Sequence, residues 1–149
     1  MKKGHRIEAL ARELSPGNDP NIYFRGYFVL FNRQDYYQAH DVLEHLWLRT
    51  EGPAAGFYKG LIQLAGAFVH LQKQFRRPFH PTDGRRLHPA WRLFKLARRN
   101  LSKFAPEYHG FRVDQVLGLC DGQIAALEKS NFQKNPWRPE AAPELRYEK

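Results

Sequence analysis

The chain has 149 residues, 42% of them hydrophobic and 14% aromatic, an ordinary composition for one globular domain. A chain of this length buries roughly two-thirds of its unfolded surface. The single cysteine, Cys120, excludes an internal disulfide and a cysteine-based zinc site. The first residues lack a signal-peptide pattern, and no stretch reaches the roughly 18 apolar residues of a membrane span. We therefore expect a cytoplasmic protein without a membrane partner.

The positive charge is concentrated in one part of the chain. Twenty-four lysines and arginines against 15 acidic residues give a net charge of +9. Residues 73–112 hold 11 of these basic residues against only Asp83 and Glu107, whereas the remainder holds 13 residues of each sign. The whole excess therefore lies in one continuous segment.

The N-terminal part predicts one helix after a flexible start. Residues 1–18 are expected to form a flexible segment with at most a short, loosely held helix. Asp19 and Pro20 are typical of a helix start, because aspartate favours the N-cap and proline the first helical position. We expect the first firm helix to run from this point to about Asn32.

Two helices are predicted to follow. Asp35 is a candidate N-cap for a helix that continues to about Thr50, where Gly52 and Pro53 end it. Residues 54–75 are apolar on nearly every face of a helix, which is typical of a helix at the centre of a bundle.

The second half of the chain predicts two more helices. Residues 76–86 contain two prolines and a glycine and are expected to form a loop. Apolar residues at helical spacing predict helices over 89–104 and 114–129. The proline-rich tail, 131–149, is predicted to be extended or disordered.

These elements define the predicted fold class. No stretch shows the sustained period-two alternation that is typical of strands, and no repeat recurs at a fixed period. Short loops favour antiparallel neighbours. We therefore predict an all-α, single-domain antiparallel bundle of about five helices over residues 19–130, followed by the extended tail.

An acid and a histidine interrupt the apolar side of the helix that follows Asp35. His40 and Glu44 are four residues apart, so they share a face, and they lie on the flank of the apolar stripe. A polar pair at such a position must either be hydrogen-bonded or serve a function.

The pair lies within sequence blocks that resemble a known family. The blocks are FNRQDYYQAHDVLEHLW, GFYKGLIQLAGAFVHLQ and PAWRLFKLARRNLSKFAPEYHGF, which together cover residues 31–111. They resemble the small helical prokaryotic proteins catalogued as domain of unknown function 309. The resemblance implies a compact helical bundle, with His40, Glu44 and Gln63 at signature positions, and it implies no reaction. The basic, proline-containing link from Arg76 to His88 departs from the usual family pattern.

Three interpretations of His40 and Glu44 remain open. They could supply two metal ligands, but His45 lies about 140° from His40 around the helix and no spacing marks a third ligand. They could act as catalytic acid and base on water, since no serine, threonine or cysteine nucleophile accompanies them apart from Thr50. They could form a buried polar lock between helices, in which removal of one partner costs about 3–5 kcal/mol. We expect the lock, with no metal and no cofactor.

Other polar residues are predicted to gather around this pair in an inward-facing cluster. The predicted members are Asn32, Tyr37, His40, Glu44, Gln63 and His70. The alternative for Gln63 and His70 is a strip on the solvent side of the helix over 54–75.

The basic segment is the candidate contact surface. Its predicted members are Arg76, Arg77, Arg85, Arg86, Arg92, Lys95, Arg99 and Lys103. They could form a polyanion or nucleic-acid surface that reads no sequence, or simply the solvated face of a helix in a basic protein. No recognised nucleic-acid-binding motif accompanies them.

Together these patterns favour a binding or interaction module over an enzyme. A protein partner or a homo-oligomer is a further candidate. The alternative function is a small hydrolase-like enzyme that uses His40 and Glu44 to activate water, with or without a metal.

Overall fold

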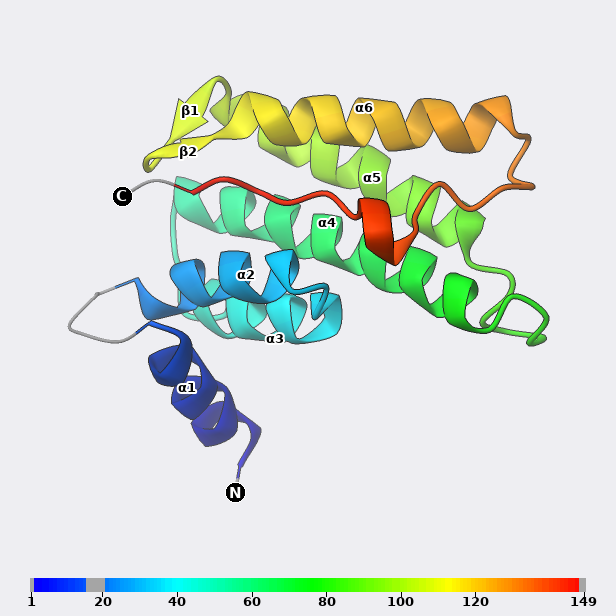
Figure 1. Ribbon diagram of the computed structural model, residues 1–149. Helices are drawn as coiled ribbons and strands as arrows, with labels where there is room; N and C mark the ends of the chain where they lie inside the picture. Colours follow the sequence, from blue (N-terminus) through cyan, green and yellow to red (C-terminus); the bar gives the residue numbers. More distant parts are fainter. Residues whose placement is uncertain (1, 16–20, 148–149) are drawn as a thin grey trace.

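The computed structural model describes residues 2–15 and 21–147, and this part of the chain is predominantly helical (Figure 1). The helices are α1 (Lys3–Leu14), α2 (Ile22–Asn32), α3 (Tyr36–Trp47), α4 (Pro53–Arg76), α5 (Leu87–Leu101) and α6 (Val113–Lys129). Two short 3-10 helices, η1 (Ser102–Phe104) and η2 (Pro139–Ala141), and two short strands, β1 (Glu107–Tyr108) and β2 (Phe111–Arg112), complete the elements. The predicted all-α bundle is confirmed.

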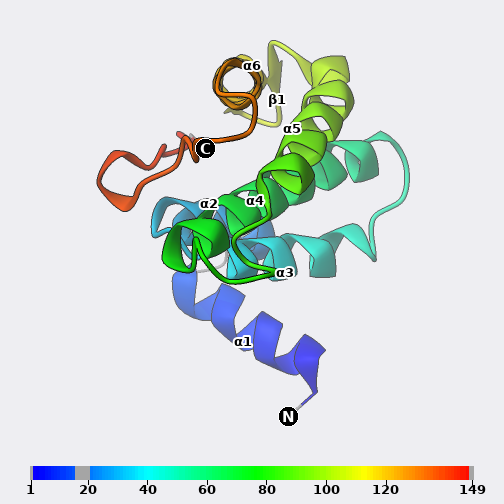
Figure 2. The same ribbon diagram turned by 90° about the vertical axis from the view of Figure 1, so that its right-hand side faces the viewer.

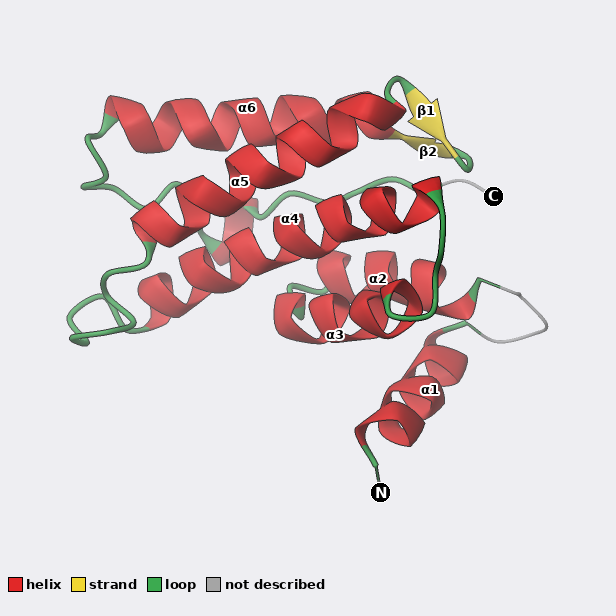
Figure 3. Cartoon of the chain, turned by 180° about the vertical axis from the view of Figure 1, so that it is seen from behind, coloured by secondary structure: helices red, strands yellow, loops and turns green. Residues whose placement is uncertain are grey.

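Helix α4 lies at the centre of the bundle. Helices α5 and α6 lie on one side of it, and α2 and α3 lie on the other (Figures 1 and 2). The consecutive helices α4, α5 and α6 run antiparallel, as the view from behind also shows (Figure 3). Gly52 and Pro53 start α4, and Phe57, Leu61 and Leu64 are among its fully buried side chains. The central position predicted for this helix from its nearly continuous apolar surface is therefore the observed one.

Aromatic rings connect the two sides of the bundle through α4. The ring of Phe68 lies 5.4 Å from that of Phe31 on α2 and 5.2 Å from that of Phe94 on α5, in both cases edge to face. It also stacks on Tyr36 of α3 at 5.3 Å. Edge-to-face and offset contacts of this kind add about 0.5–1.5 kcal/mol each beyond the area they bury. The core therefore depends on rings, as the 14% aromatic content indicates.

The N-terminal segment differs from the flexible one that we predict over residues 1–18. Residues Lys3–Leu14 form a regular helix, α1, which contacts α2 and α3. Ile7 and Ala11 are one turn apart and both are buried. The helix start predicted at Asp19 and Pro20 lies outside the described residues, and α2 begins at Ile22.

Several element boundaries differ from the predicted ones. Asp35 occupies the N-cap position of α3, but its side chain makes no capping hydrogen bond. Helix α5 ends at Leu101, and the predicted remainder continues as η1. The hairpin of β1 and β2 has strands of only two residues, too short for alternation to reveal, and turns through His109 and Gly110 with φ of 51° and 77°.

The C-terminal tail packs against the bundle as far as residue 147. It is mostly irregular in secondary structure, in keeping with its prolines, and includes η2. Trp137 is buried and donates a hydrogen bond from Nε1 to the Tyr36 hydroxyl over 3.0 Å. Asn32 donates to the Leu145 carbonyl and accepts from the Leu145 amide, over 2.9 and 2.7 Å. Buried anchors and paired backbone groups hold this described part of the tail in place.

Replacing Gly60 with alanine is expected to lower the free energy of unfolding by about 1–2 kcal/mol. A Cβ atom at Gly60 would lie 2.6 Å from Cγ of the buried Leu101, so α4 and α5 could not approach as closely. Urea unfolding of Gly60→Ala measures this change. The matched control is Gly118→Ala on α6, where a Cβ meets no atom within 4 Å and alanine is expected to stabilise by about 0.5–1 kcal/mol. Equal effects at the two glycines would contradict the close approach.

Candidate functional site

His40 and Glu44 lie on one face of α3, with His40 between two carboxylates. The His40 Nε2 atom is 3.7 Å from Oε2 of Glu44, and its Nδ1 atom is 3.3 Å from Oδ1 of Asp41. Asp41 in turn lies 3.6 Å from the Lys3 amino group on α1. Both ring nitrogens of His40 therefore have an acidic neighbour.

The prediction that His40 and Glu44 form a buried polar lock is wrong, because the two side chains are not buried. The side chains of His40 and Glu44 are 30% and 35% exposed, so solvent reaches both of them. The neighbouring Tyr37 is 59% exposed, with its ring centroid 6.0 Å from that of His40. The pair is a partly exposed polar contact at the surface, because the α3 flank on which it lies faces solvent.

The other predicted members of the cluster have partners elsewhere. Asn32 is bonded to the tail, as described above, and Gln63 accepts a 2.7 Å hydrogen bond from Asn100 of α5 through Oε1. His70 contacts Arg86, at the start of α5, over 3.1 Å. The six predicted residues therefore do not form one cluster. Helical spacing indicates which face a side chain shares, but not which helix packs against that face.

His70 belongs instead to a polar network that joins α4 to the loop after it. Arg86 contacts Nδ1 of His70 through Nη1 and donates to Oδ1 of Asp83 through Nη2 over 2.6 Å. The backbone amide of Arg86 donates to Oε1 of Gln74 over 2.6 Å. Burial lowers the pKa of His70, and the positive charges of Arg86, Lys73 and Arg92 lower it further. The neutral imidazole is thus the form that accepts a hydrogen bond from Arg86.

The eight predicted basic-face residues have three kinds of environment. Arg77 and Arg86 pair with Asp83, at 3.2 and 2.6 Å, and Arg86 is half-buried, so the prediction that it faces outward is wrong. Lys95 lies over the ring of Trp91, 4.2 Å from its centroid. The remaining five basic residues have no carboxylate partner within residues 2–15 and 21–147. They are Arg76, Arg85, Arg92, Arg99 and Lys103.

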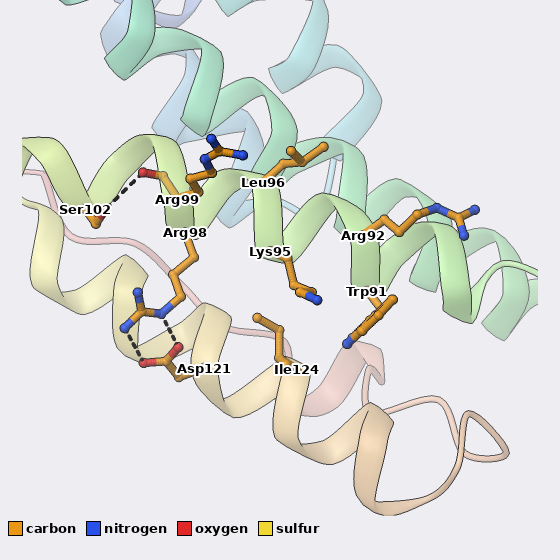
Figure 4. A pocket seen from close by; sticks show the side chains of 9 residues that line it. All are labelled: Trp91, Arg92, Lys95, Leu96, Arg98, Arg99, Ser102, Asp121 and Ile124. Carbon is orange, nitrogen blue, oxygen red and sulfur yellow. Dashed lines mark hydrogen bonds and ion pairs between the residues drawn. The ribbon is translucent and has the colours of Figure 1, made fainter.

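A groove of about 800 Å³ runs along α5 beside α6 (Figure 4). Its lining residues are Trp91, Arg92, Lys95, Leu96, Arg98, Arg99, Ser102, Asp121 and Ile124. Trp91, Lys95 and Ile124 lie between the two helices, whereas Arg92 and Arg99 lie on the side of α5 away from α6 (Figure 4). The volume falls in the range of ligand-binding clefts. The groove thus combines an apolar wall with several cations.

Sequence reasoning missed part of this groove. Trp91 is half-buried, and its Nε1 atom donates to Oε2 of Glu128 over 3.1 Å. Arg98 forms a bidentate pair with Asp121 of α6 and bridges the two helices. These partners are 23 and 37 residues apart in the chain. No local spacing could have indicated these contacts, although the cation run in 92–103 does mark the α5 side.

The described residues offer few alternatives for a reactive site. Among residues 2–15 and 21–147 there is no group of three or more histidine, cysteine, aspartate or glutamate side chains placed to hold a metal ion. Cys120 is buried on α6, and burial raises the pKa of its thiol to about 12. A thiol with that pKa is a poor nucleophile at neutral pH.

Within the same residues, no helix has both the length and the apolar character to cross a membrane.

The fold and the groove define a small all-α protein with one strongly basic helix face. Residues 24–80 of the chain match the model of the family described as "Domain of unknown function (DUF309)", which confirms the family resemblance that the first two sequence blocks indicate. The match covers α3 and α4 with His40, Glu44 and Gln63, and it ends before α5. A search of curated proteins and a search of solved structures each found no match.

Replacing Glu44 with glutamine is expected to lower the free energy of unfolding by less than about 1 kcal/mol, because exposed ion pairs contribute little. His40→Gln is expected to behave in the same way, since its side chain is 30% exposed. Chemical denaturation of the two variants and the parent protein measures these changes. A loss of about 3–5 kcal/mol for either variant would instead indicate a buried, uncompensated partner.

Stability is expected to fall as the pH drops below the ordinary histidine pKa of 6.5, and His70→Gln is expected to reduce this fall. Because the pKa of His70 is lowered in the folded protein, the unfolded chain binds a proton more readily in this range, and protonation favours unfolding. The pKa of His45 is also lowered by burial, so part of the fall remains in the variant. Urea unfolding between about pH 8 and about pH 5.5 tests this. Parallel profiles for parent and variant would contradict it.

Proposed function

We propose that this protein is a binding module whose basic α5 face binds the phosphate backbone of a nucleic acid without reading its sequence. The observation that carries the proposal is the set of cations on and around α5 that pair with no acidic side chain of the described residues. Arg76, Arg85, Arg92, Arg99 and Lys103 lack a carboxylate partner within the described residues 2–15 and 21–147. All five are exposed.

The spacing of these cations on α5 and η1 supports a linear ligand. Arg92 and Arg99 are seven residues apart on α5, and Lys103 follows four residues later on η1. At 100° per residue the first two lie within about 20° of one another around the helix, and a seven-residue step advances about 10 Å along its axis. Charges repeated along one line of a helix face suit a polymer that carries one phosphate per unit better than a compact anion.

The acidic residues nearby are already engaged. Asp83 pairs with Arg77 and Arg86, and the hydrogen bond from Arg86 is the main reason that its pKa is lowered. Asp121 pairs with Arg98. Each of these carboxylates therefore has a cation of its own, and the unpaired arginines of the face retain their full positive charge toward a ligand. This arrangement raises the local concentration of an anion and hastens its association.

The hydrolase-like alternative has no comparable support. Neither the groove along α5 nor the small cavity of about 290 Å³ between α1 and α3 is lined by His40 or Glu44. The basic face is a distinct surface, so its test does not depend on that pair.

The parent protein is expected to bind a labelled duplex and a labelled single strand of about 20 units, with affinity that falls steeply with salt, by a log-log slope of about −0.7 to −0.9 per phosphate neutralised. Arg92→Gln/Arg99→Gln is expected to weaken binding and make the slope shallower by about 1.4–1.8, since two phosphate contacts are lost. Fluorescence anisotropy at several salt concentrations measures both quantities.

The matched control removes two arginines from the opposite end of the molecule. Arg6→Gln/Arg12→Gln changes the net charge equally, but both residues lie on α1, which is separated from α5 by the rest of the bundle (Figure 1). This variant is expected to keep the parent slope. A salt-independent affinity, or equal losses in the two double variants, would overturn the proposal.

A further inference from the structure

The loop between α4 and α5 presents one aromatic ring entirely to solvent. Phe79 is 98% exposed, the most exposed of the large hydrophobic side chains among the described residues. Single exposed apolar residues are common on protein surfaces and are not informative alone. Phe79 differs from such residues in two ways. The loop that carries it is held by many contacts, and cations lie beside it.

The loop is held by hydrogen bonds on both sides of Phe79. His80 donates from its amide to the Arg77 carbonyl over 3.1 Å, and the Gly84 amide donates to the His80 carbonyl over 2.9 Å. The Nδ1 atom of His80 accepts from the amides of Thr82 and Asp83, over 3.1 and 3.0 Å. A ring carried on such a scaffold loses less conformational freedom on binding than one on a flexible loop.

Close packing and ion pairs fix the loop further. A Cβ atom at Gly84 would lie 2.3 Å from the Pro78 carbonyl oxygen, so the backbone folds tightly over the residue that precedes Phe79. Asp83 bonds Arg77 on one side of the loop and Arg86 on the other, and Arg86 is tied to α4 through Gln74. The described contacts therefore hold the loop backbone while leaving the phenylalanine ring itself without a partner.

The surroundings of Phe79 are cationic rather than apolar. Arg76 and Arg85, at the two ends of the loop, are exposed and lack a carboxylate partner within residues 2–15 and 21–147. The loop leads directly into α5, which carries Arg92 and Arg99. An aromatic ring at the end of a line of cations matches the arrangement by which proteins bind single strands, where rings stack on bases while cations follow the backbone.

We infer that Phe79 is a stacking platform for an unpaired base, so that the ligand of the basic face is a single-stranded nucleic acid. The inference deepens the proposed function and rests on it. A duplex keeps its bases stacked inside and offers Phe79 no free face, whereas every base of a single strand has one. Membrane-binding segments bury a broad apolar helix face, and the described loop offers a single ring.

The experiment compares Phe79→Ala with the parent protein on a single-stranded oligonucleotide and on a duplex of the same length. Loss of one stacked base is expected to weaken single-strand binding by about 5- to 150-fold, while the salt slope and the duplex affinity stay unchanged. Phe79→Trp is expected to restore single-strand binding, because tryptophan also stacks on bases. The control Leu48→Ala removes another exposed side chain, 70% exposed at the end of α3, and is expected to change neither affinity.

The outcomes separate this inference from the proposed function. A steep salt slope with equal single-strand affinity for Phe79→Ala and the parent would overturn the stacking role and leave the basic face intact. A flat salt slope on both ligands would overturn both. If Phe79→Ala weakened binding to vesicles of phosphatidylserine and phosphatidylcholine but not to the oligonucleotide, the ring would be a membrane contact, and the inference would be wrong.

Discussion

The packing of α4 against its neighbours on both sides is the constraint on which the rest of the structure depends. The ring of Phe68 contacts rings from α2, α3 and α5 at centroid distances of 5.2–5.4 Å. Gly60 lets α5 approach α4 closely enough for Leu101 to be fully buried. Because the apolar stripe of α5 packs against the core, the opposite face of α5 is exposed to solvent. The line of arginines on α5 is therefore a consequence of how the core is packed.

The positive charge of that face depends on the positions of the acidic residues. The segment 73–112 has 11 basic residues and two acidic ones, so most of its cations could not be neutralised locally. Asp83, in the loop between α4 and α5, pairs with Arg77 and Arg86, and Asp121 of α6 pairs with Arg98. Arg92 and Arg99, which have no carboxylate partner among the described residues, lie along one line of α5, and Arg76 and Arg85 lie at the ends of the loop that presents Phe79. Charge and an aromatic ring are thereby brought to one region by the same helix and its preceding loop.

His40 and Glu44, which the resemblance implies are at signature positions, do not form the buried contact that their sequence suggests. They share a face of α3, as their spacing indicates, but that face is partly open to solvent, and Gln63 bonds Asn100 instead. Asp41 adds a second carboxylate on the other ring nitrogen of His40. Surface pairs of this kind contribute little to stability, so the pair does not hold the bundle together.

Local patterns could predict the helices, because apolar periodicity and the proline and glycine breaks act within a few residues of the chain. For this reason the central α4, the α5 stripe through Phe94 and the loop over 76–86 were all predictable, and so was the concentration of charge. The tiny hairpin and the packing of α1 depend on contacts that no periodicity expresses.

The sequence by itself determined the fold class, the family match over residues 24–80 and the basic segment, since these follow from residue order alone. Only the tertiary structure decided which side chains meet. It separated Gln63 and His70 from His40, turned Arg86 inward, and joined Arg98 to Asp121 across 23 residues to form the groove. The physical reason is that a helical pattern specifies which residues share a face, whereas the partner of that face is chosen by the packing of the whole core.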